Sequence, residues 1–110
     1  MKLPNPERAI VDIQKLRDYC LNPEHPRGRH KARVFEASLG WTMDKATDLR
    51  QALLSAVADN VASPTQEDEH GQRYVVDFVA NGPVGRAIVR SSWIVRRGED
   101  FPRLTSCYVI

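Results

Sequence analysis

The stretch from His25 to Arg33, HPRGRHKAR, holds residue types that transfer protons and bind phosphate. Four Lys or Arg residues and two of the chain's three histidines fall within it. Histidine serves as an acid or a base near neutral pH, while Lys and Arg bind phosphate oxygens. Basic side chains at the start of a helix oppose the positive end of its dipole. An anion bound there would explain the cluster, since open backbone N–H groups at a helix start favour one.

Three helices are expected to position this stretch. Asp12 can cap a first helix, which the two prolines of NPEHPRG end. Gly28 allows the chain to enter a second helix, and Gly40 is placed as its C-terminal stop. A third helix is expected to start within 42–44. The apolar positions that carry these two helices recur at helical spacing: Ala32, Phe35 and Leu39, then Ala46, Leu49, Leu53 and Val57.

After residue 60 the apolar pattern changes to strict alternation. Strands are predicted over 73–79, 87–96 and 103–109, separated by the turn sequences NGPVG and RRGED. The segment 61–66 is a further candidate edge strand, kept short by Pro64. Helices followed by strands predict an α+β fold, in which N-terminal helices (about 12–59) pack on one face of a C-terminal antiparallel sheet of three or four strands (about 61–110).

The other face of this sheet is expected to stay open. If Val89 and Trp93 lie under the helices, Arg90, Ser92 and Arg96 must point the opposite way, because side chains alternate along a strand. Such a polar face is either simply solvated or a surface that binds a ligand.

Composition limits the classes of protein to consider. A chain of 110 residues with 42% hydrophobic content is expected to form one domain, 1–110. It has no apolar run long enough for a membrane span and no signal sequence at its start, so no membrane partner and a cytoplasmic location are expected. Cys20 and Cys107 have no metal-ligand spacing and are expected to be reduced, buried thiols, and neither a metal nor another cofactor is expected.

Charge alone does not predict a nucleic-acid binder, because the net charge is only +2. Its distribution is more informative. Arg residues outnumber Lys residues by twelve to four, and the planar guanidinium matches phosphate oxygens better than an ammonium does. This bias favours an anionic ligand.

Two long motifs of the chain resemble an uncharacterised family of small bacterial proteins. The early motif is LPNPERAIVDIQKLRDYCLNPEHPRGRHKARVFEASLGW, and the late one is GQRYVVDFVANGPVGRAIVRSSWIVRRGEDFPRLTSCYV. The resemblance covers nearly the whole chain. Cys20 stands where an apolar residue is common in that family. His30 and Arg33 are not motif positions, so they are poorer candidates for functional residues than His25, Gly28 and Lys31.

The resemblance implies a context rather than a reaction. Members of that family occur alone or at the C-terminus of large secreted proteins, often beside a small gene, as in toxin–antitoxin and polymorphic-toxin systems. The expected order of helices and then sheet is similar to the barnase, endonuclease-U, colicin and RelE-like ribonuclease toxins. Fold likeness alone does not carry function. RNA and a cognate antitoxin or immunity protein are the partners that this context predicts.

Metal-independent RNA cleavage needs a base, an acid and cations that stabilise the phosphate charge. The sequence predicts His25, Lys31 and Thr105 as catalytic residues. The residues predicted to bind substrate are Arg27, Gly28, Arg86, Arg103 and Tyr108.

Several of these residues also have a purely structural interpretation. His25 can cap a turn, and Arg103 can pair with Glu99 or Asp100. Thr105 is a good strand former, and Tyr108 can belong to the core.

Two functions therefore remain open: a toxin-like ribonuclease, and a non-catalytic interaction module that binds a cognate partner. Clustering of His25, Lys31, Arg86 and Arg103 in one cleft at the start of the second helix favours the enzyme. Dispersal of these residues, with an exposed apolar patch around Ile88 and Ile94, favours the module.

Overall fold

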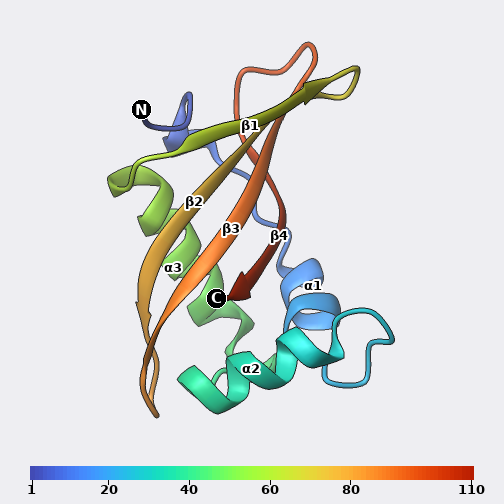
Figure 1. Cartoon of the computed structure of the whole chain (residues 1–110), viewed down its shortest axis with the longest axis vertical. Coiled ribbons are helices and arrows are strands. Elements are labelled where there is room, and N and C mark those ends of the chain that lie inside the picture. Colours follow the sequence, from blue (N-terminus) through green and yellow to red (C-terminus); the bar gives the residue numbers. More distant parts are fainter.

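The computed structural model describes every residue from Met1 to Ile110, with the helices before the strands (Figure 1). The helical elements are η1 (Pro6–Arg8), α1 (Ile13–Lys15), η2 (Leu16–Cys20), α2 (Arg29–Leu39), η3 (Met43–Lys45) and α3 (Ala46–Asp59). The strands are β1 (Ser63–Asp68), β2 (Gly71–Asn81), β3 (Arg86–Arg96) and β4 (Arg103–Val109). The predicted α+β class and the order of its elements are confirmed.

The four strands form one antiparallel sheet in the order β1-β2-β3-β4. β2 and β3 pair without interruption from Gly71↔Arg96 to Asn81↔Arg86. β1 pairs only with the first half of β2, up to Ser63↔Val75, and its register shifts between Pro64 and Glu67. The expected edge strand therefore exists, but it begins and ends about two residues later than the pattern indicates.

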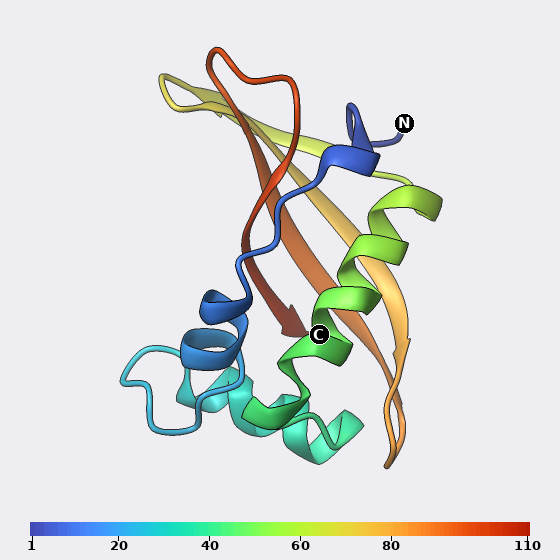
Figure 2. The same cartoon turned by 180° about the vertical axis from the view of Figure 1, so that it is seen from behind.

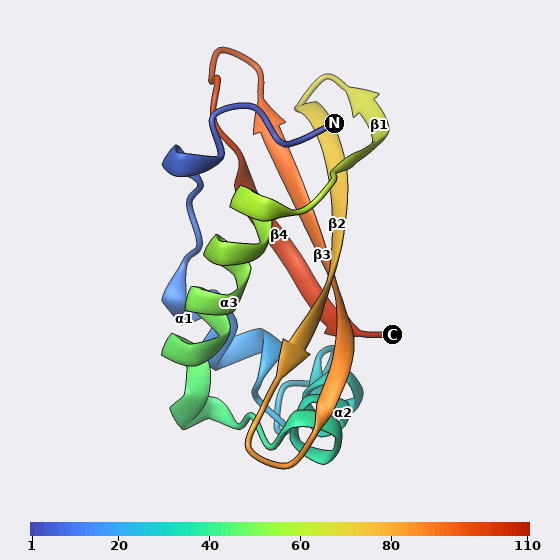
Figure 3. The same cartoon turned by 90° about the vertical axis from the view of Figure 1, so that its left-hand side faces the viewer.

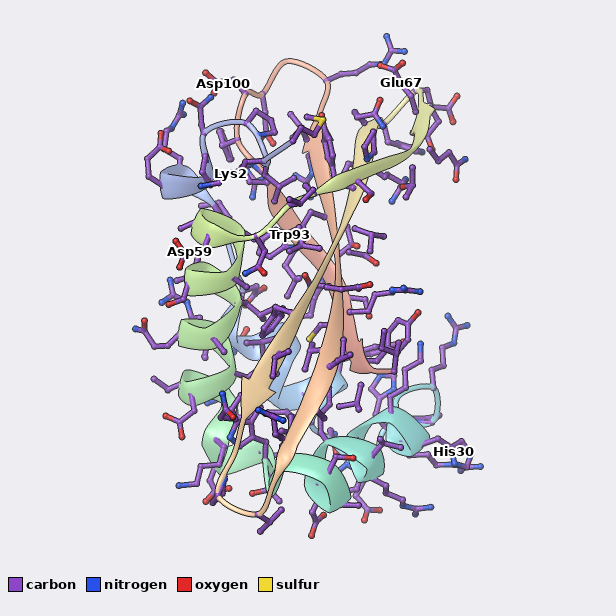
Figure 4. The ribbon with its side chains drawn as sticks, turned by 60° about the vertical axis from the view of Figure 1, so that its left-hand side comes forward. Lys2, His30, Asp59, Glu67, Trp93 and Asp100 are labelled. Carbon is purple, nitrogen blue, oxygen red and sulfur yellow. The ribbon has the colours of Figure 1, made fainter.

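Helices cover one face of the sheet. Figure 2 shows α3 lying across the sheet, and Figure 3 shows α1 and α3 on the same side, with α2 at one end of the strands. Val89 and Trp93 are fully buried on this covered face, whereas the next residue, Arg90, lies on the opposite face, which we call the outer face. Figure 4 shows Trp93 between the sheet and α3. The expected division of the sheet into a covered and an open face is confirmed.

The three predicted helices form, with one difference. The Asp12 carboxylate caps the first helix by accepting from the Gln14 N–H at 2.9 Å. Only Ile13–Lys15 is α-helical, because the chain widens into a π-helical turn over Leu16–Cys20. The first helix is thus shorter and less regular than its apolar spacing suggests. None of the helices combines the length and the apolar character that crossing a bilayer requires.

The β2–β3 hairpin tip packs against the C-terminal end of α2, which requires glycine at two positions. A Cβ on Gly82 would lie 2.0 Å from the Leu39 carbonyl oxygen, and one on Gly85 would lie 2.7 Å from the Ser38 carbonyl oxygen. Gly40 ends α2 with a φ of 75°, as the sequence predicts. The tip and the helix end therefore hold each other in place.

Truncation of the α2 core residue tests this packing. Phe35 is completely buried, so Phe35→Ala should leave a cavity and lower the free energy of unfolding by about 3 to 5 kcal/mol. Val34→Ala, at the exposed neighbouring position, should change it by less than about 0.5 kcal/mol. Urea unfolding followed by tryptophan fluorescence measures both, and equal effects of the two substitutions would contradict the assigned packing of α2.

Candidate functional site

A row of polar side chains crosses the outer face of the sheet and continues onto α2. Asp77, Arg90 and Tyr108 are direct neighbours on β2, β3 and β4. The Lys31 ammonium lies 4.4 Å from the centroid of the Tyr108 ring and extends the row onto the helix. We call these four residues the outer-face row. It brings together two cations, one carboxylate and one phenol on the open side of the molecule.

Lys31 reaches the row because of its place at the start of α2. Ala32 and Phe35 are buried, so the helix is anchored by its apolar stripe, while Lys31 itself is exposed. Gly28 precedes the helix and provides no side-chain cap, which leaves amides of the first turn open. An ammonium over an aromatic face is held by the ring quadrupole and still meets solvent. Lys31 and Tyr108, which were predicted separately from the sequence as a catalytic and a substrate-binding candidate, are therefore in contact on the outer face.

Arg90 is a functional candidate that was not among the catalytic and substrate-binding residues predicted from the sequence. Its guanidinium donates twice to the Asp77 carboxylate, from Nε to Oδ1 and from Nη2 to Oδ2, both at 2.9 Å. This pairing with Asp77, helped by the nearby Tyr108 hydroxyl, raises the pKa of Arg90. Counting back from the NGPVG turn places Asp77 opposite Arg90, so the cross-strand pair was available from the sequence.

His25 forms the turn before α2 instead of presenting a free base. Its Nδ1 accepts the backbone N–H groups of Arg27 at 3.1 Å and Gly28 at 3.2 Å. The ring meets Tyr19 edge-on, with 4.6 Å between the ring centroids. Because Nδ1 accepts, the neutral ring carries its proton on Nε2. The interpretation of His25 as a residue that caps a turn thus holds for the neutral ring, and Nε2 is the ring's one N–H donor.

Arg27 and Gly28 take part in this turn through their backbones. Gly28 is required because a Cβ would lie 2.6 Å from the Tyr19 carbonyl oxygen. The Arg27 side chain is exposed beside the start of α2. Arg27 and Gly28, both predicted to bind substrate, therefore lie next to His25 in the same turn.

Thr105 occupies a bulge in β4. Ser92 pairs with Ser106 and Trp93 pairs with Leu104, which leaves Thr105 as the extra residue. Its hydroxyl donates to the Ser92 carbonyl at 3.0 Å, and its own carbonyl accepts from the Lys15 ammonium at 3.3 Å. Both polar groups are thus engaged in holding β4. These contacts agree with the structural interpretation of Thr105, and its catalytic role stays a prediction.

Arg103 lies at the other end of β4 from Tyr108. The two positions are five residues apart along a strand, roughly 16 Å. Arg103 donates to both carboxylate oxygens of Glu99, at 3.0 and 2.9 Å. Of the two partners that the sequence allowed, Glu99 and Asp100, it therefore pairs with Glu99. Figure 4 shows Asp100, beside this pair, and His30, on the first turn of α2, at opposite ends of the molecule.

Arg86 is also separate from the start of α2. It begins β3 directly after Gly85, whose backbone touches Ser38 near the C-terminal end of the helix. The expectation that His25, Lys31, Arg86 and Arg103 share one cleft is therefore wrong. Arg86 begins β3, Arg103 begins β4 at the opposite end of the sheet, and only His25 and Lys31 lie close together, at the start of α2.

Comparison with known proteins places the chain in a family. The family described as "Domain of unknown function (DUF6883)" matches residues 2–110. The chain belongs to this family. No curated protein matches the sequence. A chain of the contact-dependent growth inhibition toxin - immunity protein complex from Klebsiella pneumoniae 342 has a similar fold, with a TM-score of 0.69 and 15% identity over 94% of this chain and 95% of that one.

Exposed apolar residues of this DUF6883 chain gather beside the outer-face row. Val79 and Ile88 are paired across β2 and β3 and are 56% and 47% exposed, and Ile110, 54% exposed, bonds through its N–H to the Ile88 carbonyl. Ile94 is only 6% exposed. An exposed apolar patch, the feature that favours the interaction module, is therefore present, but it is made of Val79, Ile88 and Ile110 and does not include Ile94.

The two cysteines of the DUF6883 chain are free, buried and next to each other in the core. Hydrogen bonding from Cys107 lowers the pKa of the Cys20 thiol, and the same bond together with burial raises the pKa of Cys107. Their burial agrees with expectation, but their proximity was not visible from their spacing.

No group of three or more His, Cys, Asp or Glu side chains comes together in a way that could hold a metal ion.

The titration of Glu99 tests whether Arg103 is engaged. The Arg103 guanidinium lowers the pKa of Glu99, so the pair adds stability at pH above the ordinary Glu value and loses it as pH falls through the lowered one. Arg103→Gln should raise the Glu99 pKa in an NMR titration, while Arg97→Gln should leave it unchanged. An unaltered midpoint in Arg103→Gln would mean that Arg103 is free to bind a ligand.

Proposed function

We propose that this chain is a toxin-type domain that cleaves RNA without a metal, with the outer-face row as its phosphate site. The observation that carries the proposal is the contact between Lys31 and Tyr108 beside Arg90, which sets two cations around a proton-bearing hydroxyl. The fold likeness to a chain of a toxin–immunity complex supports the toxin context, and a cognate protein that neutralises the domain is part of the proposal.

The chemistry requires charge stabilisation and proton transfer. Attack of a ribose 2′-hydroxyl on the adjacent phosphorus places extra negative charge on the phosphate oxygens. Lys31 would bind this charge together with Nη1 of Arg90, the guanidinium nitrogen that does not donate to Asp77. The 2′-hydroxyl would lose its proton to bulk water, because the one carboxylate of the row, Asp77, is paired with Arg90. The Tyr108 hydroxyl would donate its proton to the leaving oxygen. Asp77 holds Arg90 in a fixed orientation through its two hydrogen bonds. His25 would add its Nε2–H as a donor at the start of α2.

A non-catalytic interaction module is the second candidate. Arg86 and Arg103 lie away from Lys31, and by the criterion drawn from the sequence this dispersal favours the interaction module. The ribonuclease proposal rests instead on the outer-face row. The exposed patch of Val79, Ile88 and Ile110 is a surface that a protein partner could cover. The two candidates differ in one measurable property, since only the first degrades RNA.

Substitutions within the row test catalysis. Lys31→Ala and Tyr108→Phe should each lower the rate of RNA cleavage in a chelator-containing buffer by at least about 100-fold, because each removes a charge or a proton from the transition state. Both side chains are partly or fully exposed, so thermal melting should shift by only a few degrees. Gel analysis of RNA and differential scanning fluorimetry give the two values.

The matched control is Arg33→Ala, which removes an exposed cation two residues along α2 from Lys31 and should keep most of the activity. Full activity of Lys31→Ala would remove that residue from the site. An inactive parent protein that binds a cognate partner would establish the second candidate instead.

Salt dependence tests phosphate binding separately from cleavage. If Lys31, Arg90 and the neighbouring basic residues contact several phosphates, RNA affinity of the Tyr108→Phe protein should fall at least about tenfold between 50 and 200 mM salt, because bound cations are released. Fluorescence anisotropy with a labelled RNA measures this. Affinity that is independent of salt would contradict a phosphate site.

A further inference from the structure

β2 has a free edge over its second half. β1 pairs with Gly71–Val75 and then leaves the sheet, so the segment from Val76 to Asn81 has β3 on one side and no strand on the other. Such an edge presents a row of backbone donors and acceptors to any strand that approaches.

The residues whose backbone groups point to this edge follow from the register. The Ile88 carbonyl accepts from Ile110 on the β4 side, so the Val79–Ile88 pair is not hydrogen-bonded between β2 and β3. Hydrogen-bonded and non-hydrogen-bonded pairs alternate along an antiparallel ladder. The N–H and C=O groups of Asp77, Val79 and Asn81 therefore point toward the free edge.

A groove of about 700 Å³ follows this edge between β2 and α3. Phe78 from the covered face and Val79 from the outer face both line it, so the groove runs along the edge of the strand and not over one face. Trp41 and Ala52 add apolar surface, and Ser55 lines the groove from the helix. The groove therefore combines an apolar lining with open backbone groups.

The groove is acidic although the protein carries a net charge of +2. Asp48 and Asp59 of α3 line it, no Lys or Arg does, and neither carboxylate takes part in an ion pair. Negative potential in a groove attracts basic side chains and repels nucleic-acid phosphates.

The free part of β2 also lacks the usual protection of an edge strand. β1 carries Pro64, an irregular register and the acidic residues Glu67 and Asp68, all of which discourage pairing with another chain. The segment 76–81 has no proline, lysine or bulge, and it exposes Val79. An unprotected edge beside an apolar groove is suited to receive a strand.

We propose that this groove binds an extended segment of a partner polypeptide, which adds a strand to β2 and directs basic side chains toward Asp48 and Asp59. A second copy of this chain fits poorly, because pairing two β2 edges would bring the same carboxylates of both copies together. The inference is independent of RNA cleavage, because the groove lies along β2 and α3 and Lys31 and Tyr108 do not line it.

The probe is a synthetic peptide of alternating Lys and Val with Thr at both ends, compared with a matched peptide that has Glu in place of Lys. The basic peptide should bind at least about tenfold more tightly at low salt. Binding should slow amide hydrogen exchange at Asp77, Val79 and Asn81. The amides of Phe78 and Ala80, which already face β3, should not change.

Two α3 variants locate the site. Ser55→Arg places a bulky cation in the groove and should abolish peptide binding, whereas Ala58→Arg, at an exposed α3 position outside the groove, should not. Both variants should keep the parent's melting temperature and RNA cleavage. Equal affinity for the two peptides, protection confined to other amides, or concentration-dependent self-association that protects these amides would each overturn the proposal.

Discussion

The indole N–H of Trp93 donates to the Ser91 hydroxyl, which in turn donates to the Val76 carbonyl, at 2.9 and 2.7 Å in the middle of the core. Ser91 is fully buried, so its hydroxyl must be satisfied internally, and in the observed register of β2 against β3 the Val76 carbonyl satisfies it. A shift by one residue would exchange the two faces of the sheet. The register that gives the buried Ser91 hydroxyl its partner is the same one that places Asp77 opposite Arg90 on the outer face.

Those parts of the fold that depend on local pattern could be predicted from the sequence. Helical spacing and Gly40 define α2, and alternation around the NGPVG turn defines β2, β3 and the division of their faces. The shortening of the first helix was not predictable in the same way. The π-helical turn at Leu16–Cys20 is a departure from regular geometry that apolar spacing does not encode.

The candidate site was only partly predictable because its contacts join distant segments. Lys31 meets Tyr108 because α2 packs at one end of the sheet, and no rule of residue spacing predicts this placement. The choice of Arg103 between Glu99 and Asp100 depends on the path of a turn, and the ring of His25 is taken up by backbone groups beside it. The groove exists because β1 leaves β2 after Val75, and that departure follows from the three-dimensional course of the strand.

The docking of the β2–β3 tip onto the end of α2 has a consequence for how the outer-face row works. Leu39 and Gly40 at one end of the helix touch the hairpin, and Lys31 at the other end touches β4, so α2 is a strut fixed at both ends to one sheet. A rotation of α2 relative to the sheet would break both the contact with the hairpin and the contact with β4. The charged groups of the row are therefore preorganised. When an anion binds, these groups do not have to reorient, because folding has already placed them.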